Sequence, residues 1–190
     1  HWAPPDTNMA VGPTRYIQWV NDAYAIFDKE TNDAVTGPLP GNTPWIGMNT
    51  ACATNNDGDP IIQYDRKYDR WIFTQFSVST KPYLQCVAVS TTGDPTGSYY
   101  RFAINFGNSA FPDYPKLGIW PTGYFLSFNV FQGSFIGSRI CAIDRVAAVV
   151  TQSAPAPPTV ICKQLSASSG STLPADQDGR SPEGDPAFPE

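Results

Sequence analysis

Three aspartates recur in this 190-residue chain at nearly constant spacing, and they are its first candidates for chemistry. Asp6, Asp59 and Asp113 are 53 (6 to 59) and 54 (59 to 113) residues apart. Carboxylates that are brought together repel one another, so such a group binds a cation, keeps protons or is separated by water. The spacing therefore raises the question of which elements hold these residues.

The aspartates open repeat units, of which residues 57–89 contain the clearest copy. Each unit contains short runs of aromatic and β-branched residues separated by turn residues, a pattern typical of strands. The predicted strands are Tyr16–Val20 and Tyr24–Asp28; Ile61–Asp65, Trp71–Phe76, Gln85–Val89 and Tyr99–Ala103; and Lys116–Trp120, Tyr124–Phe128, Arg139–Asp144 and Thr159–Gln164. A fourth start, Glu183-Gly184-Asp185-Pro186, repeats the pattern of Asp57-Gly58-Asp59-Pro60.

A repeat of about 50 residues with several strands per unit is typical of a β-propeller. We predict an all-β chain with about three four-stranded antiparallel blades, all part of one propeller domain. The units span residues 1–56, 57–110 and 111–182, and a fourth starts at 183. Because propellers typically have four to eight blades, we expect remaining blades of the same protein or other chains to complete the ring. The alternative is an all-β sandwich with coincidental spacing.

Composition excludes several classes of partner. The net charge is −5 and the twelve basic residues are scattered, whereas nucleic acids and anionic membranes require clustered Lys and Arg. No apolar run approaches the roughly 20 residues that cross a bilayer, so membrane insertion is not expected.

Four cysteines occur without the spacing of a zinc site, and the single histidine is His1. Disulfides are therefore favoured over metal binding and over free thiols. They indicate an oxidising compartment, either extracellular or periplasmic, for a secreted protein. We favour the pairs Cys52–Cys86, which ties the linker entering the second unit to its third strand, and Cys141–Cys162, which joins neighbouring strands.

Several motifs are similar to those of a largely uncharacterised family of secreted bacterial β-propeller proteins. They are Pro4–Asn8, Asn56–Pro60, Asp69–Trp71, Cys86–Pro95 and Phe111–Lys116. More distantly, the Asp-Pro starts and the Asp69-Arg70-Trp71 turn resemble, at fold level, sialidase-like and five-bladed glycosidase propellers. The sialidase arginine cluster is not evident. These resemblances imply a fold, and a fold does not fix a function.

The first strand of a blade lies nearest the propeller axis, so Asp6, Asp59, Asp113 and Asp185 are expected to gather at one mouth of the channel. Oxygen ligands without an internal histidine favour calcium as a shared cation. Asp57 is a further candidate ligand. Other oxygen donors are available in Asn8, Asn56 and the Asp176–Gly179 loop.

Two other uses of the aspartates stay open. Glycoside hydrolysis commonly needs two carboxyl groups, for which Asp6, Asp59 and Asp113 are the catalytic candidates, although no glutamate stands at an equivalent strand start to act as the acid. Alternatively, each aspartate only caps a turn. Tyr114, Trp120 and Trp45 are candidate ligand-binding aromatics, and packing is the favoured role of Trp45.

The leading hypothesis is an extracellular, non-catalytic propeller module that binds a glycan, a protein or its own copies, with calcium as a stabiliser. The alternative is a polysaccharide-acting glycoside hydrolase with its carboxylates at the channel mouth. A Ser-His-Asp or Cys-His site cannot be assembled, because no internal histidine exists.

Overall fold

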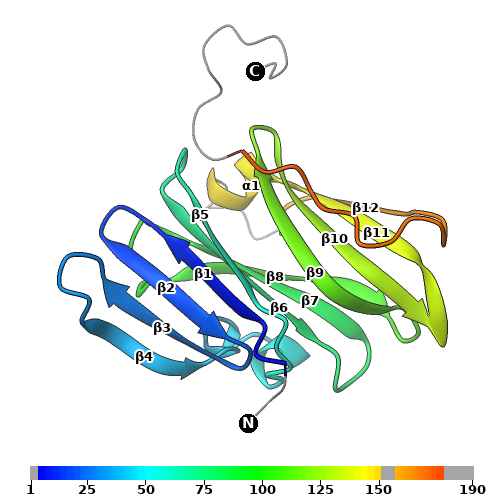
Figure 1. Cartoon of the computed structure of the whole chain (residues 1–190), viewed down its shortest axis with the longest axis horizontal. Coiled ribbons are helices and arrows are strands. Elements are labelled where there is room, and N and C mark those ends of the chain that lie inside the picture. Colours follow the sequence, from blue (N-terminus) through cyan, green and yellow to red (C-terminus); the bar gives the residue numbers. More distant parts are fainter. Residues whose placement is uncertain (1–3, 151–156, 178–190) are drawn as a thin grey trace, which may run out of the picture.

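A computed structural model describes residues 4–150 and 157–177 and shows three successive four-stranded antiparallel sheets (Figure 1). The first blade contains β1 (Thr7–Val11), β2 (Arg15–Val20), β3 (Ala23–Asp28) and β4 (Ala34–Pro40). The second contains β5 (Ile61–Asp65), β6 (Arg70–Ser77), β7 (Tyr83–Ser90) and β8 (Tyr99–Gly107). The third contains β9 (Phe111–Trp120), β10 (Gly123–Gln132), β11 (Ser134–Asp144) and β12 (Val160–Gln164). The predicted class, all-β propeller blades, is confirmed.

Little of the described chain is helical. Between the first two blades lie two 3₁₀ turns, η1 (Thr43–Trp45) and η2 (Ala51–Ala53). A short helix, α1 (Arg145–Val150), follows β11. Across residues 4–150 and 157–177, no helix is long and apolar enough to cross a membrane.

The inner strands of the three blades lie next to one another. In each blade the strands follow in sequence order, with β1, β5 and β9 at one edge of their sheets. The backbone N–H of Ile62 in β5 donates to Asn8 Oδ1 in β1 at 2.9 Å, and Gln63 Nε2 donates to the carbonyl of Leu117 in β9 at 2.8 Å. These bonds draw the starts of successive blades towards one axis.

The third blade departs from the predicted strand limits. Its first strand begins at Phe111, five residues before the expected Lys116. The Phe111 ring contacts the rings of Phe76 and Tyr83, with centroids 6.1 and 5.5 Å apart. Packing on the neighbouring blade thus accompanies the extension of β9 through a proline-containing stretch that the sequence pattern places before the strand.

Both faces of the middle blade are buried. Trp71 and Phe73 of β6 pack towards the first blade, whereas Ile72 between them packs towards the third. Trp45 belongs to the first of these two cores and is 0% exposed. Its ring therefore presents no surface to a ligand, and the structure gives it the packing role.

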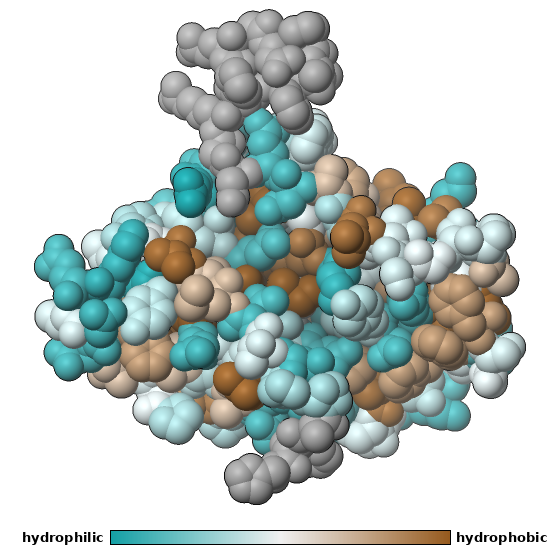
Figure 2. Space-filling view, viewed as in Figure 1, coloured by the Kyte–Doolittle hydropathy of each residue, from teal (hydrophilic) through white to brown (hydrophobic). Residues whose placement is uncertain are grey.

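The outer faces of the end blades carry exposed apolar side chains. By strand register, Met9, Val11 and Val20 share one face of the first blade, opposite its core residues. Ile140 and Ile161 share the corresponding face of the third blade. Figure 2 shows apolar surface over the third blade, at the right. This exposure suits further blades packing here, which stays a prediction.

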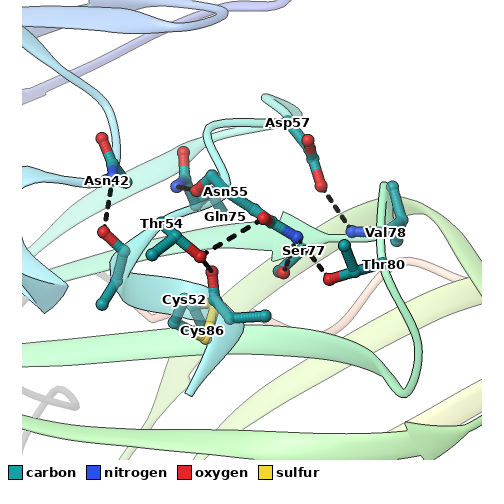
Figure 3. Close-up of a disulfide and its surroundings, with 12 residues drawn as sticks. Asn42, Cys52, Thr54, Asn55, Asp57, Gln75, Ser77, Val78, Thr80 and Cys86 are labelled. Carbon is teal, nitrogen blue, oxygen red and sulfur yellow. Dashed lines mark hydrogen bonds between the residues drawn. A yellow bond between two sulfur atoms is a disulfide. The ribbon is translucent and has the colours of Figure 1, made fainter. Parts of the chain in front are cut away.

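The structure contains both predicted disulfides. Cys52 of η2 is bonded to Cys86 of β7, and Cys141 of β11 to Cys162 of β12. Beside the first disulfide, Asn55 donates to Ser77 Oγ at 2.9 Å and to Thr80 Oγ1 at 2.8 Å (Figure 3). The loop between the first two blades is thus tied to the middle blade covalently and by hydrogen bonds.

A buried ion pair joins the second and third blades. Asp65, at the end of β5, is 0% exposed and accepts from Arg145 Nε at 2.8 Å, Arg145 Nη2 at 2.5 Å and the Tyr124 hydroxyl at 2.6 Å. The backbone N–H groups of Lys67 and Tyr68 also donate to it. Burial alone would raise the pKa of Asp65, but the bonds from Arg145 and Tyr124 outweigh it and hold this pKa below its usual range.

Arg145→Met should leave the Asp65 charge buried without its partner and should lower the free energy of unfolding by about 3–5 kcal/mol. Since the folded pKa of Asp65 is depressed, this stabilisation exists above the unfolded pKa of about 3.9 and is lost as the pH falls through the folded value. Urea unfolding at neutral and acidic pH measures both effects.

The matched control is Arg15→Met. Arg15 and Asp28 form a partly exposed pair, with 30% and 27% of their side chains accessible, so its loss should cost less than about 1 kcal/mol. Equal losses in the two variants would contradict the role assigned to the buried pair.

Candidate functional site

The three recurring aspartates stand at the starts of the inner strands. Asp6 directly precedes β1, Asp59 lies two residues before β5, and Asp113 is the third residue of β9. Asp6 and Asp59 share a left-handed backbone, with φ of 40° and 45°, and in the third blade Tyr114 has φ of 51°. Aspartate tolerates this conformation better than most residues, so each blade enters its inner strand through a similar turn.

The structure brings these aspartates within electrostatic reach of one another. Burial, followed by the negative charges of Asp6 and Asp113, raises the pKa of Asp59 to about 6. The Tyr114 backbone N–H and the Lys116 ammonium act in the opposite direction. Asp59 therefore holds its proton to a higher pH than an ordinary carboxyl group, as catalytic carboxyl groups often do.

Asp6, Asp59 and Asp113 together form what we call the acidic mouth, and an aromatic residue and a cation lie beside them. Tyr114, next to Asp113, is 51% exposed, and Lys116 Nζ lies 3.3 Å from the centroid of its ring. An ammonium over the face of a tyrosine is a favourable cation–π arrangement. No role is predicted for Lys116 from the sequence, where its only signal is that it is a single cation three residues after a repeated aspartate.

Several predicted site residues serve other contacts. Asp57 accepts from the N–H groups of Val78 and Ser79 at 2.6 and 2.8 Å and from Ser79 Oγ at 2.8 Å, so its carboxylate is engaged by the β6–β7 loop (Figure 3). Asn8 bonds Ile62, and Asn56 Nδ2 donates to the carbonyl of Asp22. These hydrogen bonds explain the side-chain conformations of Asp57, Asn8 and Asn56, and they give no independent indication that these residues bind a metal ion or a sugar.

Trp120 is placed away from the mouth. It ends β9, whereas Asp113 and Tyr114 lie near its start, and at about 3.3 Å per residue the separation along the strand is roughly 20 Å. Tyr114 and Trp120 therefore do not lie at the same site, and the role of each as a ligand-binding aromatic stays a prediction. Asp176 lies at the same distal end, where its Oδ1 accepts from the Ile119 N–H at 2.7 Å.

The predicted calcium site has no complete set of ligands in the described part of the chain. Within residues 4–150 and 157–177, no three Asp, Glu, His or Cys side chains come close enough to hold a metal ion. Asp185, the fourth predicted ligand, and the fourth blade start at 183 lie outside the described residues. The calcium site thus stays a prediction.

No protein-family model matches this chain, and no curated protein matches it. Among solved structures, the chain is similar to an exo-1,5-α-L-arabinanase from a bovine ruminal metagenomic library, with a TM-score of 0.45 and 11% identity. It is also similar to a GH43 endo-arabinanase from Bacillus licheniformis, with a TM-score of 0.38 and 12% identity. Each match covers 84% of this chain and 52% of the other. The chain thus spans about half the length of either enzyme.

Asp59→Asn should stabilise the protein at neutral pH. Because the folded pKa of Asp59 is raised, this carboxyl favours folding below its unfolded pKa, and that contribution is lost as the pH rises through about 6. The gain at pH 7.5 should be about 1–2 kcal/mol, since one pKa unit corresponds to about 1.4 kcal/mol and solvent screening reduces the full value. Denaturant unfolding in chelator, repeated at pH 4, measures it.

Asp57→Asn is the control, with the opposite expected sign. It weakens bonds from the β6–β7 loop to a charged acceptor and should cost about 1–3 kcal/mol at the same pH. A loss of stability in Asp59→Asn at pH 7.5 would show that Asp59 is a turn cap.

We propose calcium as a second occupant of the mouth, in competition with the proton on Asp59. Excess calcium should then raise the Tm at pH 7.5, because it binds only the folded state, and should raise it less at pH 5, where Asp59 is protonated. Differential scanning calorimetry in calcium and in chelator, for wild type and Asp59→Asn, measures the shift. An identical Tm of the wild type in both buffers excludes a stabilising shared calcium.

Proposed function

We propose that this chain forms part of a secreted propeller that hydrolyses glycans at the acidic mouth. The observation that carries the proposal is the convergence of Asp6, Asp59 and Asp113 from the starts of three successive blades. Glycoside hydrolysis commonly uses one protonated and one ionised carboxyl group on either side of the scissile bond. In this cluster, burial and neighbouring charges raise the pKa of one carboxyl group, Asp59. This difference supports one carboxyl group acting as the acid and another as the ionised partner.

Asp59 is the proposed general acid. Its pKa of about 6 lies well above that of an ordinary aspartate, because the carboxyl is partly buried and faces two like charges. A proton held in this way can be given to the glycosidic oxygen as the bond breaks. No glutamate stands at an equivalent strand start, so residue type alone indicates no general acid. The environment of Asp59 lets an aspartate take that role.

Asp6 or Asp113 is the proposed ionised partner, acting as nucleophile or as base towards water. Tyr114 offers an exposed ring beside Asp113 for an apolar sugar face. Lys116 covers one face of that ring and limits the ionic repulsion between the carboxylates. The two disulfides suit an oxidising, extracellular location.

Asp59→Asn should lower kcat for polysaccharide hydrolysis by about 10²–10⁴-fold, because the proton donor is lost. In the wild type, activity should fall as the pH rises through about 6. Release of reducing ends from a panel of soluble polysaccharides by the full-length protein measures both. Asp33→Asn, on an exposed turn of the first blade, is the control and should retain full activity.

The same assay distinguishes a glycoside hydrolase from a non-catalytic binding module. No reducing ends released from any polysaccharide by folded wild-type protein would support the non-catalytic binding module. Unchanged kcat in Asp59→Asn would remove Asp59 from the mechanism even if the protein is an enzyme.

A further inference from the structure

A groove with a volume of about 560 Å³ opens between the outer parts of the first two blades. Strands β3 and β4 with η1 form one wall, and the turn before β8 forms the other. The groove thus lies over the third and fourth strands from the axis, and adjacent strands are about 4.8 Å apart. It is therefore a site separate from the acidic mouth, at roughly 10–15 Å from the inner strands.

One wall of this groove contains a tyrosine whose side chain is almost fully buried. Tyr24 lines it and is only 4% exposed, with its ring held against Trp19 and Phe73 at centroid distances of 5.2 and 5.5 Å. Its hydroxyl oxygen takes part in no hydrogen bond among the described residues and is not one of their buried polar atoms without a partner, so it is accessible to solvent. An accessible hydroxyl group on an otherwise buried ring can bond a polar atom of a ligand in place of water.

The groove carries hydroxyl groups and apolar surface together. Thr36, Thr96 and Ser98 lie among its polar residues, whereas the apolar lining is Ile26, Val35, Leu39, Pro44 and Pro95. Burial raises the pKa of Tyr24 to about 12, so its hydroxyl is neutral at physiological pH and can donate or accept. Among the described residues, no carboxylate lines the groove, and the cation that does so, Arg101, donates to the carbonyl of Ile46 at 2.6 Å.

We propose that this groove binds a neutral sugar unit of a glycan chain, as a second site beside the acidic mouth. A sugar presents hydroxyl groups for Tyr24, Thr36 and Ser98 and an apolar face for Leu39 and Pro44. The volume lies in the range of small-molecule sites, about 300–1,000 Å³. When one end of a glycan chain is bound in the groove, the effective concentration of its other end at the acidic mouth rises. The inference rests on the proposed function for the identity of the ligand as a glycan.

Two variants test the groove. Tyr24→Phe removes only the hydroxyl, which has no partner to lose, and should weaken binding about three- to tenfold, the value of one neutral hydrogen bond. Gly97→Trp should fill the groove: Gly97 lines it, and an added Cβ there meets only ordinary contacts, the nearest at 3.5 Å. Tyr16→Phe, on the other face of the first blade, is the matched control.

Binding is measured by calorimetry with short arabino-, xylo-, cello- and chito-oligosaccharides, in an Asp59→Asn background so that hydrolysis does not interfere. We expect at least one neutral probe to bind, with a weaker Kd in Tyr24→Phe, loss of binding in Gly97→Trp and no change in Tyr16→Phe. No binding of any probe, or equal Kd values in all variants, overturns the inference. Hydrolytic activity tests the proposed function separately, since a groove can bind glycans in a protein that does not cleave them.

Discussion

The structure depends on one constraint, which is that a four-stranded sheet cannot bury both of its faces by itself. The middle blade meets this constraint by alternation: Trp71 and Phe73 enter one core and Ile72 enters the other. Three further features of the structure follow from the face-to-face stacking of the blades. The stacking sets the inner strands side by side, makes the interblade groove and seals the Asp65–Arg145 pair between two sheets.

The stacking of the blades also explains why Asp6, Asp59 and Asp113 lie within electrostatic reach of one another. When three blades share an axis, whatever residue starts each inner strand faces its equivalents in the neighbouring blades. With aspartate at these starts, the fold gathers like charges in a partly desolvated place and raises the pKa of Asp59. The raised pKa of Asp59 costs stability at neutral pH, and destabilised sites are commonly functional ones.

The features that sequence predicted are those with a local signal. The strands follow from alternating apolar residues and turn residues, and the blade architecture follows from the spacing of Asp6, Asp59 and Asp113. The cysteine pairs follow from blade topology. The ion pair between Asp65 and Arg145 has no such signal, because its partners are 80 residues apart and their burial depends on how two sheets pack. The position of Tyr24 in the wall of the groove is likewise a product of packing, since a tyrosine in a strand gives no indication of what its ring will contact.

Three aspartates within nine residues of the second blade show why residue type alone does not assign a role. Asp57 accepts hydrogen bonds from a loop and is thereby engaged in holding it. Asp65 is more deeply buried, yet a guanidinium and a phenol hold its pKa low, so it is a structural anion. Asp59 is partly buried and faces two carboxylates, so its pKa moves in the other direction. The donors and the charges that face each carboxylate therefore decide its role: Asp57 holds a loop, Asp65 is a structural anion and Asp59 is the proposed acid. Of the three, Asp59 alone combines a raised pKa with a position at the axis, and for that reason it carries the proposed chemistry.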